Sequence, residues 1–511
     1  MDRMGPLDAA FLQIEDEQPG TSLAISSIAV FEGPVPSAGE FETALAGRLA
    51  LIPRYRQEVR QVPFDLGPPV WVDAPDFDLA YHLRRTALPA PGGDRELAAL
   101  MGRVMSQRLD RNRPLWEYWL VEGLAEDRWA LISKVHHCMA DGVSGTDLYR
   151  VVLDPGPEPG PAVPDDWHPR PEPSTAELTA LAARDLATLP WRTTRALAGT
   201  ARSPRALGRL LLTTARGTAA LATALLPTRA SSLTGPLSAQ RRYAFARGRV
   251  EDVSAIRDTF GGTFNDVVMT AVTAGFRQLL ISRGERPAPH VIRSLVPVSV
   301  RAPGEESIRD NRVSSMLADL PVDVADPLER LAAVRELFGR LKAEHEAEAG
   351  AVLVRLAGAE PFAPVASGMR LTWRLPQRSI TTVTTNVPGP RAPLYALGRR
   401  CVEIVPYVPI ASRLRVGVSM FTYAGRLTFG ITGDYDTAAD VWTLARGIED
   451  SLDELAAAAD LAADAAPEPG TAARLAPGAD RRSSDASPAA QGASPPVSAQ
   501  TRPSSPTRAR S

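Results

Sequence analysis

The fold is indicated most clearly by the stretch WALISKVHHCMADG, residues 129–142. Its first part, Trp129 to His137, is rich in apolar and β-branched residues and predicts a strand. The pattern breaks at Cys138 to Gly142, and a helical pattern follows from Val143 to Leu153. The two histidines are therefore expected at the end of a strand that opens onto a loop, which is where α/β proteins place their ligands.

The paired histidines suit proton transfer. Side chains alternate along a strand, so we expect His136 and His137 to point to opposite faces, and only one of them can meet a given substrate. A neutral imidazole can take a proton from a hydroxyl near pH 7 and return it to a leaving group, as acyl transfer requires. We predict that His137 is this base, and that His136 supports it in a more structural role within the same catalytic set.

Two residues follow the pair at short spacing. Asp141 can orient a histidine or arginine through a charge-assisted hydrogen bond, or it can cap the helix that follows, and both roles stay open. Gly142 lets backbone and substrate approach closely, so we predict that it lines the substrate site. Cys138 lies between them and the histidines and resembles a nucleophile only by its residue type.

Two other interpretations of the histidines remain. An arbitrary His-His pair can be a hydrogen-bonded part of the core. A metal site is the second alternative, because His137 and Asp141 are four residues apart and suit chelation from a helix. No third ligand is close in sequence, since the other histidines stand in separate contexts at His82, His168, His290 and His345. We therefore predict no metal site.

Composition sets the broad class. A chain of 511 residues exceeds the size at which one core stops growing, so two lobes are expected. The formal net charge of -2 gives no overall attraction to nucleic acid. The two cysteines, Cys138 and Cys401, exclude a disulfide framework and fit a reducing cytoplasm. Residues 1–8 lack the apolar stretch of a secretory signal, and the longest apolar candidate, Gly217 to Leu226, is about half a membrane span.

Four parts are expected along the chain. Residues 1–155 alternate strand and helix patterns and form an α/β lobe with the His-His motif. Residues 156–240 begin with recurrent prolines and continue as an Arg- and Leu-rich helical segment. Alternation resumes in residues 241–463, which predicts a second α/β lobe. Residues 464–511 are rich in Pro, Ala, Ser and Gly and are predicted to stay unfolded.

Individual elements can be predicted within the two lobes. The clearest helices are predicted at Glu96 to Leu109 and Asp266 to Leu280. The strands other than the one that carries the histidines are predicted at Ala24 to Phe31, His290 to Val300, Ser379 to Asn386 and Leu427 to Gly433. Asn265 is expected to be the N-cap of the second helix, and Asn386 to Pro390 is expected to be a tight turn.

The helical segment between the lobes is basic. Seven arginines lie between Arg184 and Arg216, against one acidic residue, Asp185. Such a segment can rest on an anionic membrane surface, or it can be a solvated helix pair whose leucines pack on the body, and both interpretations stay open. Pro190 and Pro204 limit the length of any one helix.

Several motifs in order resemble one known family. The motif His136-His137-x-x-x-Asp141-Gly142 is typical of chloramphenicol acetyltransferase-like, CoA-dependent acyltransferases. Within this superfamily the chain resembles the bacterial wax ester synthase/diacylglycerol acyltransferase family, from LDAAF at residues 7–11 to about Asp440. The other matching motifs are LDRNRPLWE at 109–117, NDVV at 265–268, VPVSVR at 296–301 and TNVPGP at 385–390.

The resemblance implies a fold and a reaction. The implied fold is two similar α/β lobes with the His-His motif in a tunnel at their interface. The implied reaction is direct transfer of a long-chain acyl group from acyl-CoA, as co-substrate, to an alcohol, with no metal or bound cofactor and no acyl-Cys138 intermediate. It also favours orientation as the role of Asp141, with Arg301 as its partner, and places Asn265 and Asp266 in the substrate site.

The acceptor alcohol is expected to be diacylglycerol, which gives triacylglycerol. Long-chain alcohols, which give wax esters, are the alternative, and a non-catalytic lipid-binding relative or a condensation domain of a peptide synthetase are rivals. Where relatives carry a Met-His pair, this chain has Thr21-Ser22-Leu23. Hydroxyls at Thr381, Thr382, Thr384 and Thr385 are candidate oxyanion donors. We expect a cytoplasmic protein, with peripheral contact to the inner face of the plasma membrane or to lipid droplets as an open possibility.

Overall fold

The computed structural model describes residues 2–18, 20–139, 152–184, 187–188, 228–299, 313–348 and 379–464. The chain divides into two compact units, Met1–Ala463 and Asp464–Ser511, and the first unit holds nearly all described residues. The predicted boundaries between the lobes and the crossover remain predictions. The predicted unfolded tail begins at the last described residue and otherwise lies outside the described part of the chain.

The first sheet carries the histidine motif. Its strand order is β12-β13-β2-β7-β6-β5, and all neighbours are antiparallel except β5 and β6. The bounds are β2 Ala24–Glu32, β5 Leu83–Ala87, β6 Trp116–Leu124, β7 Arg128–His136, β12 Tyr395–Ala396 and β13 Arg399–Tyr407. The central strand β7 is buried along nearly its whole length, which explains its apolar sequence.

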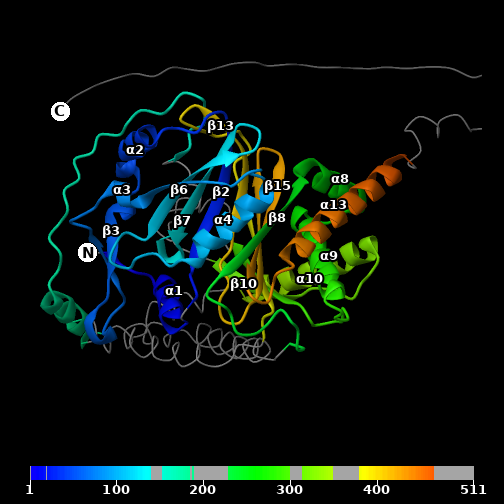
Figure 1. Cartoon of the computed structure of the whole chain (residues 1–511). Coiled ribbons are helices and arrows are strands. Elements are labelled where there is room, and N and C mark those ends of the chain that lie inside the picture. The colour runs from blue at the N-terminus through cyan, green and yellow to red at the C-terminus, as the bar shows by residue number, and fades with distance from the viewer. Residues whose placement is uncertain are drawn as a thin grey trace, which may run out of the picture. The chain divides into compact units, whose positions relative to one another are not determined.

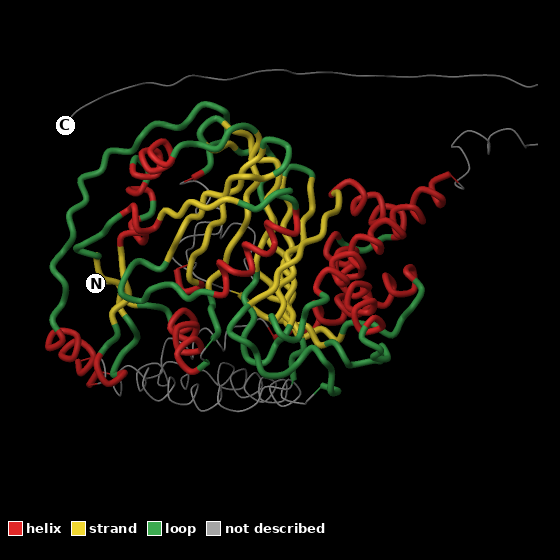
Figure 2. Tube along the Cα trace, viewed as in Figure 1, coloured by secondary structure: helices red, strands yellow, loops and turns green. Residues whose placement is uncertain are grey.

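The second sheet is formed by later residues. Its order is β10-β9-β11-β14-β15-β8. The bounds are β8 Arg241–Arg249, β9 Arg293–Ser299, β10 Val313–Asp319, β11 Thr382–Pro388, β14 Val416–Tyr423 and β15 Arg426–Asp434. Four helices gather on one side of it (Figures 1 and 2): α8 Val250–Phe260, α9 Phe264–Ser282, α10 Pro327–Glu348 and α13 Val441–Asp464. Apolar residues of these helices and of the sheet form a second core.

Shorter elements complete the first lobe. A small sheet has the order β1-β4-β3, with β1 Asp2–Arg3, β3 Gln57–Arg60 and β4 Val70–Asp73. The helices are α1 Pro6–Glu17, α2 Ala38–Ala46, α3 Leu79–His82 and α4 Asp94–Ser106. Short 3-10 turns are η1 Leu49–Leu51, η2 Pro53–Arg56, η3 Pro63–Asp65 and η4 His137–Met139. Residues 175–184 are also helical and pack on Val62, Val70 and Val72.

The chain returns to the first sheet after building most of the second. Strand β13 follows β11 in sequence but pairs with β2, so a segment of the C-terminal half completes the N-terminal sheet. Helix α4 packs against β8, and a Cβ at Gly102 would lie 2.6 Å from the carbonyl oxygen of Arg241. Only glycine allows this approach of helix to strand. The two lobes are therefore tied together by backbone pairing and by close packing.

Most predicted elements are confirmed. The predicted strands at Ala24, Trp129 and Leu427 correspond to β2, β7 and β15, and the predicted helix at Asp266 corresponds to α9. Leu115 and Trp116, in the motif at residues 109–117, are fully buried and belong to the core of the first lobe.

One element was predicted wrongly. The expected turn from Asn386 to Pro390 begins too early, because β11 continues through Pro388. Strand β11 lies inside the sheet and pairs with β14 over its whole length, so backbone hydrogen bonding overrides the local Pro-Gly signal. The predicted helix from Val143 lies almost wholly outside the described residues.

Candidate active site

The histidine pair lies where β7 ends. His136 is the last residue of β7 and stands opposite Ala24 of β2, and its amide donates to the carbonyl of Leu115, 2.9 Å away. His137 begins the turn η4, and its amide donates to the carbonyl of Leu23, 3.1 Å away. The backbone of both histidines is thus held by neighbouring segments of the chain, which fixes where their side chains start.

The prediction that the two rings point to opposite faces does not hold in detail. The strand ends at His136, and the chain turns at His137, so the alternation of a strand no longer applies there. Both rings contact helix α1: His136 lies beside Glu15 and His137 beside Phe11. Phe11 and Glu15 are four residues apart and therefore share one face of the helix. The rings nevertheless have different environments, which supports different roles.

His136 is buried and hydrogen-bonded. Its side chain is 1% exposed. The amide of Cys138 donates to its Nδ1 at 3.2 Å, and the Cys138 thiol lies 3.0 Å from the same nitrogen. Its Nε2 lies 3.3 Å from Oε1 of Glu15. Because Nδ1 accepts a hydrogen bond from a backbone amide, the ring proton belongs on Nε2, where it faces the carboxylate.

His137 is half-buried, and one nitrogen of its ring makes no hydrogen bond within the described part of the chain. The ring stacks at a tilt of 32° on Phe11, with 4.0 Å between centroids. Its Nδ1 is buried and has no hydrogen-bond partner among the described residues. Burial lowers the pKa of His137 to about 4, with a smaller contribution from His136. The imidazole is therefore neutral at pH 7 and able to accept a proton.

Glu15 is a buried carboxylate beside the pair that sequence reasoning missed. Its side chain is 2% exposed, and it accepts a hydrogen bond of 2.6 Å from the amide of Leu23 and an ion pair of 2.8 Å from Arg111. Burial alone would raise its pKa, but His136, the Leu23 amide and Arg111 outweigh it and hold the pKa at about 2. The available signal was its spacing of four residues from the apolar Phe11.

Cys138 is not placed as a nucleophile. The residue is 2% exposed, and burial raises the pKa of its thiol far above the ordinary value, with a further contribution from Asp8. A thiol that stays protonated at physiological pH is a poor nucleophile. This agrees with the direct transfer that the resemblance implies.

The motif residues at the start of α9 have local roles that were predicted in part wrongly. The N-cap is Thr263, not Asn265: the Thr263 hydroxyl accepts from the amide of Asp266, and the Asp266 carboxylate accepts from the amide of Thr263 at 2.8 Å. This is a capping box, which needs Ser or Thr three residues before the acid. Asn265 instead accepts a hydrogen bond of 3.2 Å from the side chain of Asn386 in β11. Two family motifs therefore meet at this contact.

Two of the four candidate threonine hydroxyls donate to the backbone. Thr381 donates to the carbonyl of Val291 and Thr382 to that of Val416. Thr384 accepts a hydrogen bond from Ser294 and is fully buried. Thr385 is half-buried. Thr381 and Thr382 are therefore occupied in holding the sheet, which leaves Thr385 as the more accessible candidate.

Three predicted site residues, Asp141, Gly142 and Arg301, lie outside the described residues. In the described ranges, no group of three or more His, Cys, Asp or Glu side chains could hold a metal ion. The same ranges contain no helix long and apolar enough to cross a bilayer.

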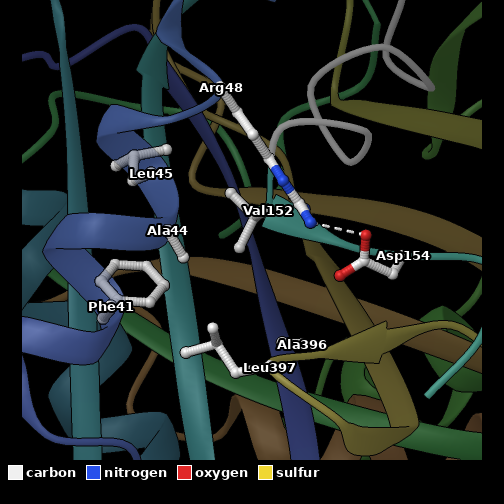
Figure 3. A pocket seen from close by; sticks show the side chains of 8 residues that line it. All are labelled: Phe41, Ala44, Leu45, Arg48, Val152, Asp154, Ala396 and Leu397. Carbon is white, nitrogen blue, oxygen red and sulfur yellow. Dashed lines mark hydrogen bonds and ion pairs between the residues drawn. The ribbon is translucent and has the colours of Figure 1, made fainter. Parts of the chain in front are cut away.

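Two cavities in the described part of the chain lie away from the histidines. One of about 10 Å³ borders the buried ion pair between Arg48 and Asp154, whose closest atoms are 2.7 Å apart (Figure 3). It has room for about one water molecule. A larger one, about 320 Å³, is lined mainly by charged side chains, including Arg128 at the other end of β7 from His136. At about 3.3 Å per residue, some 26 Å of strand separate that end from His136.

Comparison with known proteins identifies the family. The model of the wax ester synthase/diacylglycerol acyltransferase catalytic domain matches residues 4–268, and that of the WS/DGAT C-terminal domain matches residues 310–456. The Mycobacterium tuberculosis protein named "Probable diacyglycerol O-acyltransferase tgs1" is 43% identical over 89% of this chain and 96% of its own length. A second M. tuberculosis relative, also named a diacylglycerol O-acyltransferase, is 32% identical over 90% and 92%.

Solved structures confirm the predicted fold. The wax ester synthase/diacylglycerol acyltransferase from Marinobacter aquaeolei VT8 has a TM-score of 0.62 and 25% identity, over 90% of this chain and all of that one. The first condensation domain of the calcium-dependent antibiotic synthetase has a TM-score of 0.55 at 16% identity, over 89% and 96%, which shows a shared fold only. With a two-lobed α/β fold, both family domains and relatives that match 89% of its length, the chain belongs to the wax ester synthase/diacylglycerol acyltransferase family.

Proposed function

We propose that this protein transfers a long-chain acyl group from acyl-CoA to diacylglycerol and forms triacylglycerol. The observation that carries the proposal is the environment of His137: a neutral imidazole with a low pKa, held at the end of a central strand by the backbone of Leu23. Such a group is in its basic form at physiological pH. Among the described residues, the amide of His137 donates to the carbonyl of Leu23 and its ring stacks on Phe11.

The reaction uses His137 twice. Because Nδ1 is buried, Nε2 is the nitrogen that accepts the proton of the acceptor hydroxyl. The hydroxyl oxygen forms a bond to the thioester carbonyl carbon, and the carbonyl becomes an oxyanion. When the oxyanion collapses, the carbon-sulfur bond breaks, and the protonated His137 gives its proton to the leaving CoA sulfur. The acyl ester and free CoA leave, and His137 is neutral again.

Other predicted residues take supporting roles in this proposal. His136 holds the geometry of the motif, and Asp141, with Arg301 as its partner, takes the orienting role that the resemblance favours. Gly142 allows close approach of substrate. Asn265 lines the substrate site together with Asn386, to which it is hydrogen-bonded. Asp266 stabilises the start of α9 through its capping box and thereby places Asn265. The site lies in a tunnel between the two lobes.

Diacylglycerol is the preferred acceptor because the relatives with the highest identity among those compared are named as diacylglycerol O-acyltransferases. Long-chain alcohols are the second candidate, since the structurally similar Marinobacter protein is named for both activities. Acyl-CoA is a co-substrate, and the proposed chemistry needs no metal or bound cofactor.

Contact with a lipid surface is part of the same proposal. Diacylglycerol resides in membranes, and the arginines between Arg184 and Arg216 supply charge that anionic lipids attract. Most of that segment lies outside the described residues, so the support is its sequence. We expect the protein to bind vesicles that contain anionic lipid and to lose this binding when the seven arginines are replaced by glutamate. Equal binding of both proteins would contradict the surface contact but not the chemistry.

The function is tested with purified protein, a long-chain acyl-CoA and either diacylglycerol or hexadecanol. Triacylglycerol and wax ester are separated by chromatography, and CoA release is followed with a thiol reagent. We expect faster triacylglycerol formation, which His137→Ala abolishes and His290→Ala, at an exposed histidine, leaves intact. Wax ester as the main product would favour the second candidate. No product from either acceptor, with retained lipid binding, would favour a non-catalytic relative.

A further inference from the structure

We propose that Glu15 is a positioning residue for the histidine motif: it fixes the ring of His136 directly and the backbone of His137 through Leu23. The inference rests on the proposed function, in which His137 is the base. It concerns a residue on α1 that lies more than a hundred positions before the motif. Glu15 touches neither substrate nor reacting atoms in this proposal.

The burial of Glu15 shows that its charge is matched by specific donors. A carboxylate inside a protein is costly unless it is paired and hydrogen-bonded. Here Oε1 accepts from the Leu23 amide at 2.6 Å and faces Nε2 of His136 at 3.3 Å, and Oε2 pairs with Arg111 at 2.8 Å. Its partners thus come from the segment before β2, from the end of β7 and from the loop after α4. Glu15 therefore joins three segments of the chain beside the motif.

The direct effect is on the ring of His136. A neutral imidazole has one donor and one acceptor nitrogen, and the partners of each nitrogen decide which is which. Cys138 donates its amide to Nδ1, and Glu15, which can only accept, faces Nε2. Both contacts favour the same tautomer and the same ring orientation. In the other tautomer two acceptors, Nε2 and the carboxylate, would lie against each other, and Nδ1–H would face the Cys138 amide donor.

The second effect passes through Leu23. The amide of Leu23 donates to Glu15, and its carbonyl accepts from the amide of His137 at 3.1 Å. The two peptide groups of Leu23 therefore link the carboxylate of Glu15 to the backbone of His137. Thr21, Ser22 and Leu23 are all buried. A shift of Leu23 would move the start of η4 and the ring of His137.

Two arginines keep helix α1 in place for this task. Arg108 donates to the carbonyls of Glu15, Gln18 and Thr21, and Arg111 donates to the carbonyl of Leu12. Guanidinium groups at the end of a helix satisfy its last carbonyls and match its dipole. Because Phe11 lies on the same helix face as Glu15 and stacks on His137, the orientation of α1 affects both rings. Both arginines lie in or beside the family motif at residues 109–117, which gives that motif a role beyond its apolar anchors.

The first test changes the charge but keeps the shape. We expect Glu15→Gln to lower kcat by about 10- to 100-fold, the usual loss when a partner that orients a histidine is changed, with KM for acyl-CoA unchanged. The matched control is Asp16→Asn, which removes the other carboxylate that Arg111 contacts, at an exposed side chain. The control should keep its kcat. Equal kcat in Glu15→Gln and Asp16→Asn would overturn the proposal.

A double variant separates positioning from simple charge pairing. If Glu15 only neutralises Arg111, the variant Glu15→Gln/Arg111→Met removes both charges and should recover the activity of the wild type. If Glu15 orients His136, the double variant should remain as slow as Glu15→Gln. Recovery of kcat to the wild-type value would therefore contradict the proposal, whereas a kcat below that of Arg111→Met alone supports it.

A measurement on the unchanged protein keeps the proposal testable whatever the variants do. Histidine labelled with ¹⁵N reports the protonated ring nitrogen by NMR, and comparison with His136→Gln assigns the signal. We expect the neutral ring of His136 to carry its proton on Nε2. A neutral ring with its proton on Nδ1 would overturn the proposal. The NMR result does not depend on which acceptor alcohol the protein uses. The proposal about Glu15 can therefore fail or hold independently of the proposed function.

Discussion

The pH dependence of stability offers a quantitative test at His82, a buried histidine away from the motif. His82 is 1% exposed, stacks on Trp116 with 4.3 Å between centroids, and donates from Nδ1 to the Trp116 carbonyl at 2.8 Å. Burial lowers its pKa from 6.5 to about 4. The folded protein thus keeps this ring neutral at pH values where the unfolded chain protonates it.

The sign and size of the effect follow by linkage. Above pH 6.5 the ring is neutral in both states, so its contribution to stability is complete. As the pH falls from 6.5 toward 4, only the unfolded state binds the proton, and stability falls by about 1.4 kcal/mol per pH unit. Between pH 6.5 and 5.0 the loss from His82 is therefore about 2 kcal/mol. Below pH 4 the His82 ring also takes up a proton in the folded state, and its contribution to the pH dependence of stability ends.

The assay is urea unfolding followed by tryptophan fluorescence at pH 6.5, 6.0, 5.5 and 5.0. His82→Gln should be less stable at every pH, but its slope should be smaller than that of the wild type by about 1.4 kcal/mol per unit. Phe77→Leu is the control, because Phe77 packs on the His82 ring and does not titrate. It should lower stability and keep the slope. An unchanged slope in His82→Gln would refute the reasoning.

Three further predictions concern the site and its support. Since burial holds the pKa of His137 at about 4, kcat/KM for the acceptor should stay constant from pH 7.5 down to 5.5, and an acid limb with a midpoint near 6.5 would contradict this environment. Since the Cys138 thiol is buried and protonated, Cys138→Ala should keep activity within about threefold of the wild type, a much smaller loss than removal of a catalytic group causes. Complete loss of activity with normal folding would point to a covalent step. Arg48→Met leaves the buried Asp154 carboxylate without its ion-pair partner and should lower the free energy of unfolding in urea by about 3–5 kcal/mol. The variant Arg48→Met/Asp154→Leu should recover most of this loss. Equal stability of the single and double variants would refute the role of the pair.

The sequence predicted those parts of the fold whose cause is local. The apolar run before His136 predicted β7, because a strand that is buried on both faces consists mostly of apolar residues. The helical periodicity after Asp266 predicted α9, because a helix that buries one face repeats its apolar residues at helical spacing. The motif also located the histidines at a strand end. These features depend on neighbours within one element, so a single sequence contains the information.

Other features depend on distant neighbours and left no such pattern. Strand β13 pairs with β2, although most of the chain lies between them. The hydrogen bonds between strands join backbone groups, which are the same in every residue, so the sequence says little about which strands pair. Asn265 and Thr263 are both good N-caps by residue type, and only the geometry shows that Thr263 is used. Glu15 stands next to the exposed Asp16 in a helix with several acids, and burial of one of them is visible only once Arg111 is placed beside it.

The central claim is that His137 is the base that activates the acceptor hydroxyl. The most direct measurement is the initial rate of CoA release with long-chain acyl-CoA and diacylglycerol for wild type and His137→Ala, with acyl-CoA affinity measured separately by calorimetry. We predict that the rate falls by about 10² to 10⁴, the usual contribution of a general base, while acyl-CoA affinity stays within a factor of two to three. Equal rates of CoA release from the two proteins would contradict the claim.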